Sequence, residues 1–187
     1  MLQGRIVGSE GVKDVSPALN DITITRHGSL QILSLKIYVN GQFLCRWNAD
    51  GIIISTPTGS TGYNLSAGGA IVTPEARLLL ITPICPHSLT SREVVVSAED
   101  EIMVEIRQGR RGPDVGAVVT FDGRELVELN ANDKIEVINS NIGTQKEDIK
   151  ILELFRQVLN TNKPISYSRK GKYANFCNWY RGVGIRN

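Results

Sequence analysis

Residues 50–69 combine an acidic residue, a β-branched run and a loop rich in glycine and hydroxyl side chains. Asp50 and Gly51 precede the run Ile52–Ile54, which suits a strand covered on both faces. Pro57 cannot donate to a strand ladder, so the chain must turn there. The turn supplies hydroxyls and flexible backbone from Thr58, Gly59, Ser60, Thr61, Gly62 and Ser66. Such a loop suits a ribose or phosphate, and the alternative is an ordinary connection between a strand and a helix.

Two common phosphate-binding patterns do not account for this loop. The sequence contains no Gly-x-x-x-x-Gly-Lys-Ser/Thr, and therefore no P-loop lysine. It also contains no Gly-x-Gly-x-x-Gly that opens a helix in a βαβ unit. A nucleotide bound here must be held by other groups.

The loop closely resembles the signature of the NAD kinase family, Asp-Gly-hydrophobic-Ser-Thr-Pro-Thr-Gly-Ser-Thr-x-Tyr-x-Leu-Ser-x-Gly-Gly. Upstream, Ala18-Leu19-Asn20-Asp21 looks like the family's Asn-Asp/Glu contact to the dinucleotide. Downstream, residues 82–89 match, and Phe121-Asp122-Gly123 stands where the family has a similar Asp-Gly turn. The resemblance covers roughly residues 1–144.

The resemblance implies transfer of the terminal phosphate of ATP, or of polyphosphate, to the 2′-hydroxyl of the adenosine ribose of NAD, which yields NADP. It also implies Mg with ATP in the full-length enzyme, and homodimers or homotetramers. Asn20 and Asp21 would contact the adenosine half and Asp50 the nicotinamide-side ribose. The NAD-binding residues implied in full are Asn20, Asp21, Asn48, Asp50, Thr61, Gly62, Tyr63, Asn64, Leu65 and Ser66.

Residue chemistry fits these roles but leaves alternatives open. A carboxylate such as Asp21 or Asp50 can accept two hydrogen bonds from a ribose diol. Asn20-Asp21 could equally form a local Asx turn, and Asp50-Gly51 a turn before a strand. Tyr63 could be a half-buried ring or could stack on an adenine. Asp122-Gly123 favours a hairpin turn, although the resemblance allows Asp122 to face the dinucleotide.

The sequence departs from the family in the catalytic motif. It contains no Gly-Gly-Asp-Gly, whose aspartate is the family's general base and lies in an amino-terminal α/β domain. We therefore expect a carboxy-terminal fragment that lacks this domain, has no catalytic residue of its own, binds no cofactor by itself and has negligible kinase activity alone. A milder departure is Gly62, where many members carry alanine. The alternative functions are a non-catalytic dinucleotide-binding or interaction module and, less well supported by the loop, a lipid kinase relative.

The resemblance ends near Gln145, and the charge changes there as well. Residues 146–187 contain nine Lys/Arg and three Asp/Glu, or +6, against +2 for the whole chain. Apolar residues recur with helical spacing between Ile151 and Leu159, which predicts a docking helix. The basic and aromatic residues beyond could contact nucleic acid, but we favour a solvated basic face.

Composition excludes several other classes. No stretch approaches the roughly twenty apolar residues that a membrane span needs, so we expect a cytoplasmic protein without membrane contact. The cysteines, at positions 45, 85 and 177, are odd in number and far apart, which argues against disulfides and a Cys-based zinc site. His27 and His87 are the only histidines, and we expect no structural metal.

The elements that must position the loop are mostly strands. Residues 33–39 alternate apolar and polar, and Asn40-Gly41 is a strong hairpin signal. Further strands are expected at 22–24, 42–44, 52–54, 94–96, 102–106, 117–119 and 135–138. Thr61 would cap a short helix through Tyr63 and Leu65. We predict a mainly β, β-sandwich-like domain with few short helices over residues 1–144, and a tail with one helix over 145–187.

Overall fold

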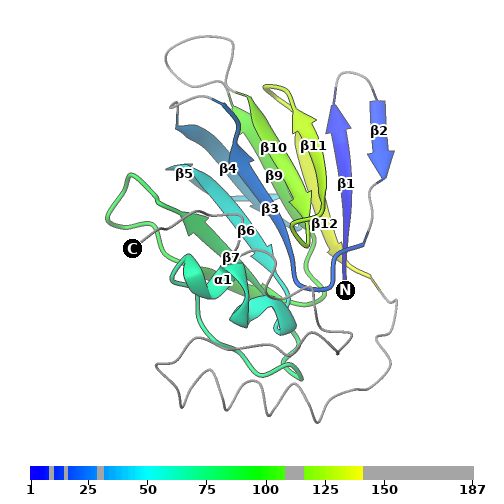
Figure 1. The fold of residues 1–187 in the computed structure, drawn as a ribbon, viewed down its shortest axis with the longest axis vertical. Coiled ribbons are helices and arrows are strands. Elements are labelled where there is room, and N and C mark those ends of the chain that lie inside the picture. Colours follow the sequence, from blue (N-terminus) through cyan, green and yellow to red (C-terminus); the bar gives the residue numbers. More distant parts are fainter. Residues whose placement is uncertain (9–10, 15–16, 29–31, 108–115, 141–187) are drawn as a thin grey trace, which may run out of the picture. The chain divides into compact units, whose positions relative to one another are not determined.

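A computed structural model of the chain describes residues 1–8, 11–14, 17–28, 32–107 and 116–140 (Figure 1). All of them lie in the first of two units, residues 1–146. The predicted helix between Ile151 and Leu159 and the basic segment after it lie outside the described residues. The predicted boundary near Thr144 stays a prediction.

The described part of the chain is built mainly of strands. Two short helical turns follow the sixth strand: the 3-10 turn η1, Thr58–Thr61, and the helix α1, Tyr63–Ser66. The strands are β1 Leu2–Gly8, β2 Gly11–Asp14, β3 Asp21–Arg26, β4 Leu33–Val39, β5 Gln42–Ala49, β6 Gly51–Ser55, β7 Leu78–Ile84, β8 Val94–Ser97, β9 Ile102–Arg107, β10 Ala117–Phe121, β11 Glu125–Leu129 and β12 Lys134–Asn139.

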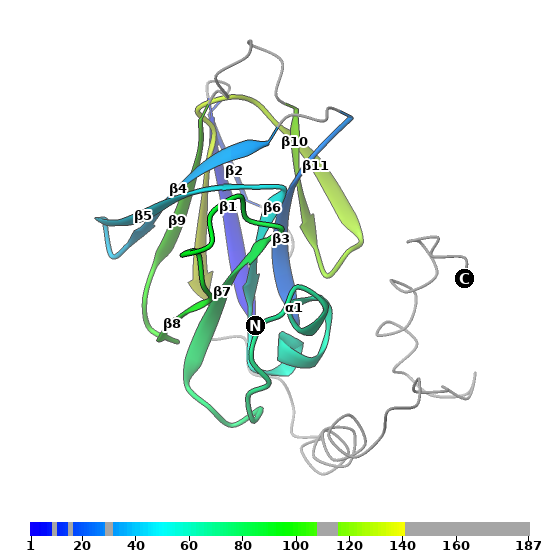
Figure 2. The same ribbon diagram turned by 90° about the vertical axis from the view of Figure 1, so that its left-hand side faces the viewer.

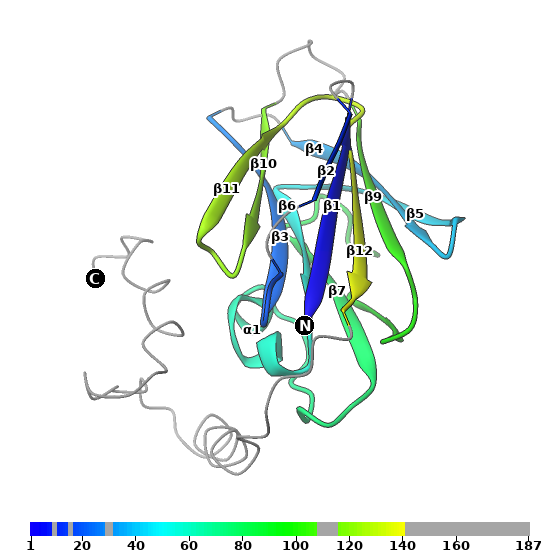
Figure 3. The same cartoon turned by 90° about the vertical axis from the view of Figure 1, so that its right-hand side faces the viewer.

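These strands form two antiparallel six-stranded sheets. One has the order β2-β1-β12-β9-β4-β5 and the other the order β11-β10-β3-β6-β7-β8. The chain passes repeatedly from one sheet to the other, and Figures 2 and 3 show the sheets as two facing layers. The prediction of a mainly β, sandwich-like domain is confirmed.

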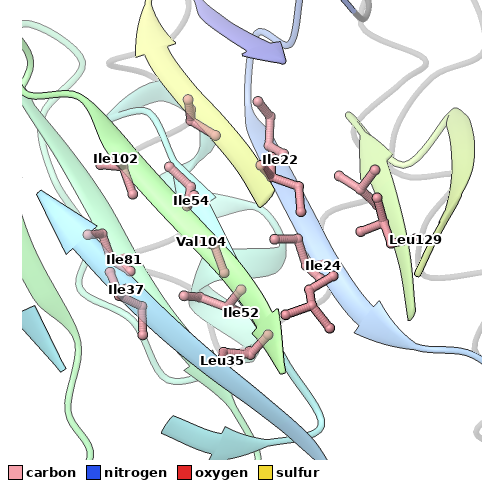
Figure 4. Packing of buried hydrophobic residues seen from close by; sticks show 14 of the residues in the cluster. Ile22, Ile24, Leu35, Ile37, Ile52, Ile54, Ile81, Ile102, Val104 and Leu129 are labelled. Carbon is pink, nitrogen blue, oxygen red and sulfur yellow. The ribbon is translucent and has the colours of Figure 1, made fainter. Parts of the chain in front are cut away.

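The core lies between the inner faces of the sheets. Ile22 and Ile24 of β3, with Leu35 of β4, are fully buried, and Figure 4 shows side chains of both layers pointing toward one another. Each such side chain contributes roughly 1.5–3 kcal/mol by leaving water. In β6 every residue is buried, including Ile53, as the β-branched run predicted for a strand covered on both faces.

Two predicted hairpin turns are confirmed by backbone conformation. Asn40 and Gly41 have φ of 51° and 74° between β4 and β5, and Asp122 and Gly123 have φ of 49° and 65° between β10 and β11. Positive φ at both central residues is the requirement of a type I′ turn, which Asn and Asp tolerate better than most residues. The β10–β11 turn matters for the site, because Asp122 is in it.

One local prediction is wrong. Thr61 does not cap α1, because it is the last residue of η1, and α1 has Gly62 as its N-cap with no side-chain hydrogen bond. Gly62 has φ −91° and ψ −129°, so a residue in a non-helical conformation separates the two helical turns.

Candidate functional site

The loop after β6 is tied to the segment before β3. The Thr56 hydroxyl donates to the Leu19 carbonyl at 2.8 Å and accepts from Gly59 N at 3.0 Å. The Thr56 backbone N–H donates to the Asn20 carbonyl at 2.9 Å. Gly59 lies so close to this carbonyl that a Cβ there would collide with it. The loop therefore needs glycine at position 59, and α1 lies beside the start of β3 (Figures 2 and 3).

Asn20 directly precedes β3 and is partly buried, whereas Asp21 is the first residue of β3 and is buried. Among the described residues, Asn20 Oδ1 is the buried side-chain polar atom that has no hydrogen-bond partner. The Asp21 side chain accepts a hydrogen bond from the Thr23 hydroxyl at 2.9 Å, and the residue is 8% exposed. Burial raises the pKa of Asp21 to about 6, with a further rise from the charge of Asp122 and an opposing effect of Thr23.

Asp122 reaches the same segment from the β10–β11 turn. Its carboxylate accepts hydrogen bonds from the backbone N–H groups of Leu19, Asn20 and Asp21 at 2.8, 2.7 and 3.1 Å. Its own N–H donates to the Asp21 carbonyl at 3.0 Å. Asp122 thus serves the hairpin turn and also contacts the Asn20-Asp21 segment.

Asp50 lies at the opposite end of β6 from the loop. The strand register pairs Asp21 with Ser55 at one end of β6 and Thr25 with Gly51 at the other. There Asp50 Oδ1 lies 3.0 Å from Arg26 Nε, and its backbone N–H donates to Ile84 at 3.0 Å. Asn48 is exposed near the end of β5, and its carbonyl accepts from His87 N at 2.8 Å.

Tyr63 is the first residue of α1. Burial raises the pKa of its phenol, and the charges of Cys85, Asp21 and Asp50 raise that pKa further. The ring is partly buried, which leaves it able to stack on a ligand.

The remaining predicted loop residues differ in exposure. Ser66 is exposed, and Thr61, Gly62 and Leu65 are partly buried. Asn64 is fully buried: its amide donates to the carbonyls of Ser60 and Ala70 at 3.4 and 3.1 Å, and its Oδ1 accepts from the Thr82 hydroxyl at 2.6 Å. Its polar atoms thus bind the loop itself, and ligand contact by Asn64 stays a prediction.

Several residues that shape the site were missed by sequence reasoning. The Glu93 carboxylate accepts from Ala70 N at 3.0 Å and from the Thr82 hydroxyl at 2.8 Å, which holds the end of the loop. Arg26 pairs with Asp50 from 24 positions away. Charge complementarity was the available signal for Arg26, but no short spacing pairs it with Asp50.

The described residues contain no group of three or more His, Cys, Asp or Glu side chains that could hold a metal ion. The Mg that the family implies stays a prediction. A groove of about 310 Å³ lies elsewhere, lined by residues that include Val12, Lys13 and Glu128, and by none of the predicted site residues.

No helix in the described ranges is long and apolar enough to cross a membrane. The predicted cytoplasmic location stays a prediction.

The two-sheet architecture is also found in solved structures of two kinases. Yeast NADH kinase complexed with NADH superposes with a TM-score of 0.72 at 29% identity, over 90% of this chain and 51% of that chain. An NAD kinase from Archaeoglobus fulgidus in complex with ATP gives 0.66 at 26% identity, over 85% and 60%.

Sequence comparison defines the family. A family model described as the ATP-NAD kinase C-terminal domain matches residues 19–146. NAD kinases of Agathobacter rectalis and Lachnoclostridium phytofermentans are 50% and 47% identical over 137 residues, which is 73% of this chain and 47% and 46% of those proteins. The chain belongs to the NAD kinase family. It spans about half the length of the curated relatives that it matches.

Proposed function

We propose that this chain is the dinucleotide-binding part of an NAD kinase, which phosphorylates the 2′-hydroxyl of the adenosine ribose of NAD with ATP or polyphosphate and yields NADP. Family membership supports the activity, and one observation in the chain supports the site. Asn20 Oδ1 is buried without a hydrogen-bond partner, beside the buried Asp21 and the loop after β6. A buried acceptor left unpaired costs about 1–3 kcal/mol, so such atoms usually face a partner.

A nucleoside carries hydrogen-bond donors for the acceptors beside the Ser55 end of β6. Hydroxyl or amino donors of the adenosine half would pair with Asn20 Oδ1 and with the Asp21 carboxylate. Asp50 would accept from the ribose of the nicotinamide half at the other end. A ligand that reached both ends would span the five residues of β6, roughly 17 Å of strand, and a dinucleotide has two sugar groups that can be separated in this way.

Phosphoryl transfer needs more than the described site. The sequence has no Gly-Gly-Asp-Gly, and a positioned general base typically contributes on the order of a hundred- to ten-thousandfold in rate. Mg would accompany ATP in the full-length enzyme and supply charge neutralisation at the phosphates. We therefore expect the 187-residue chain alone to bind NAD but to form NADP at a negligible rate. Robust NADP formation by the pure chain would refute this expectation.

Calorimetric titration with NAD and NADP tests the proposed site. We expect Asn20→Ala and Asp50→Ala each to weaken NAD binding by about tenfold, since each removes a hydrogen bond of about 1.4 kcal/mol to the ligand. Asn139→Ala, at an exposed position of β12, is the matched control and should leave binding unchanged. A folded chain that binds NAD equally well in all four forms would contradict the assignment of these residues.

Self-association belongs to the same proposal. We expect homodimers or homotetramers, and light scattering at several protein concentrations measures this directly. If binding of NAD rises with the oligomer fraction, the two ends of β6 act in sites shared between copies of the chain. A monomer that binds NAD with full affinity would exclude shared sites.

A further inference from the structure

The backbone of residues 19–21 is held on both sides by side chains distant in sequence. Asp122 accepts from all three N–H groups, at 2.8, 2.7 and 3.1 Å, and donates its own N–H to the Asp21 carbonyl. Thr56 completes the set, because its hydroxyl donates to the Leu19 carbonyl and its N–H to the Asn20 carbonyl. Every backbone donor and acceptor of the three residues is therefore engaged.

We propose that Asp122 is the positioning residue of the dinucleotide site: its carboxylate fixes the backbone of residues 19–21 so that Asn20 and Asp21 meet the ligand in a set geometry. This inference rests on the proposed function for its ligand, and on the hydrogen bonds of Asp122 for its geometry. In this proposal Asp122 acts through the backbone, because both of its carboxylate oxygens accept hydrogen bonds from N–H groups of residues 19–21.

A carboxylate is the group that this arrangement requires. An ionised carboxylate accepts through both oxygens and donates nothing, whereas an asparagine would direct an NH₂ group at one of the N–H donors. Hydrogen bonds to a charged acceptor are also shorter and stronger than neutral ones, and two of these are 2.7–2.8 Å long. The constraint lowers the entropy lost when a ligand binds, because the segment is already ordered.

The competing explanation is that Asp122 serves only the β10–β11 turn. Its φ of 49° is a conformation that aspartate and asparagine both tolerate. Asp122→Asn should therefore keep the turn and lose an acceptor for residues 19–21, which separates the two explanations. Glu128→Gln is the control, because Glu128 is an exposed carboxylate on the same hairpin.

Amide hydrogen exchange on the full chain tests the geometry without any ligand. We expect Asp122→Asn to reduce protection of the Leu19, Asn20 and Asp21 amides by at least about tenfold, or about 1.4 kcal/mol. The Arg124 amide, which donates to Phe121 within the turn, should keep its protection, and Glu128→Gln should change neither. Unchanged protection at residues 19–21 would overturn the proposal.

NAD titration tests the consequence for the site. We expect Asp122→Asn to weaken binding at least about tenfold in the wild-type background and by a smaller factor when Asn20→Ala is already present, because Asp122 acts in part through that residue. A general loss of stability would add to the Asn20→Ala effect instead, and would overturn the proposal, as would unchanged affinity in Asp122→Asn. If the wild-type chain binds no NAD, the proposed function of this chain fails, and amide exchange alone decides the positioning.

A second variant is available in case Asp122→Asn does not fold. Asp122→Gly removes the carboxylate and keeps the positive φ at no steric cost. If Asp122→Asn unfolds, the same exchange and binding results are expected from Asp122→Gly. Unfolding of both variants would overturn the proposal, because Asp122 would then hold the whole sandwich together rather than the site.

Discussion

Replacing Asp21 by asparagine should stabilise the protein at neutral pH. Asp21 is 8% exposed, and burial raises its pKa from 3.8 to about 6. A difference of this size disfavours the charged carboxylate in the folded state by about 3 kcal/mol. Asparagine has nearly the same shape, carries no charge and can still accept from the Thr23 hydroxyl. The stabilisation by Asp21→Asn should therefore approach this value at pH 7 and above.

The sign of the pH dependence follows from the raised pKa. Below pH 3.8 the carboxyl is protonated in both the folded and the unfolded chain, and it carries no charge penalty. As the pH rises from about 4 through 6 the unfolded chain ionises first, so the wild-type protein loses stability relative to Asp21→Asn. Above about pH 6 the carboxyl is charged in both states, and the difference stays constant at its maximum.

Urea unfolding of both forms between pH 4 and pH 8 measures the difference. Subtracting the two curves cancels the titration of carboxylates that both proteins share, and Glu128→Gln controls for removal of an exposed charge. A pH-independent difference, or an Asp21→Asn protein that is less stable than wild type at pH 7, would refute the reasoning. The first result would mean that folding does not shift the pKa of Asp21, and the second that the folded protein stabilises its carboxylate.

Three other substitutions test contacts at the two ends of β6. Gly59→Ala should destabilise by about 1–3 kcal/mol, measured by urea unfolding, since the new Cβ collides with the Asn20 carbonyl; full stability would contradict the close approach. Thr82→Val should cost about 1–3 kcal/mol in the same assay because Thr82 is buried and hydrogen-bonded, and an isosteric variant of equal stability would contradict that. Arg26→Met should change unfolding by less than about 1 kcal/mol, because Asp50 is about 30% exposed, yet calorimetry should show weaker NAD binding; unchanged affinity would separate the pair from the site.

Local sequence patterns predicted the strands and turns that a few adjacent residues specify. Alternating burial in β4, the β-branched run of β6 and the Asn40-Gly41 turn are each written within a few residues, and each is confirmed. β7 was missed because residues 82–87 resemble a stiff connector with two prolines. Pro83 is tolerated within β7 because β8 pairs only with residues 78–81, so Pro83 pairs with β6 alone.

The first two strands were missed for a related reason. In β1 the apolar residues Leu2 and Ile6 are separated by glycine and a charged residue, which weakens the alternation. β2 has four residues and pairs only with β1. These strands are specified by their neighbours: the β1 partner β12 comes more than a hundred residues later in the chain.

Strand order explains why residue spacing alone could not relate the candidate site residues to one another. β10, β3 and β6 are neighbours in one antiparallel sheet, so Phe121, Ile22 and Ile54 lie side by side across it. Consequently the end of β10, the start of β3 and the end of β6 lie at the same end of the sheet. The β10–β11 turn, the Asn20-Asp21 segment and the loop after β6 adjoin these strand ends. Asp50 lies next to the opposite end of β6, directly before Gly51. No local pattern connects these segments, because hydrogen bonds between positions more than a hundred residues apart depend on strand order.

Strand order also explains why one aspartate can serve both fold and site. The β10–β11 turn must have positive φ, which restricts its first residue to a few types, and aspartate is the one that adds a charged acceptor. Because β10 is paired with β3, that acceptor faces the backbone before β3. Glycine at this position would close the hairpin but leave the N–H groups of residues 19–21 without a side-chain acceptor, and asparagine would keep only one acceptor oxygen for them. The presence of aspartate here is therefore explained by the Asn20-Asp21 segment rather than by the turn.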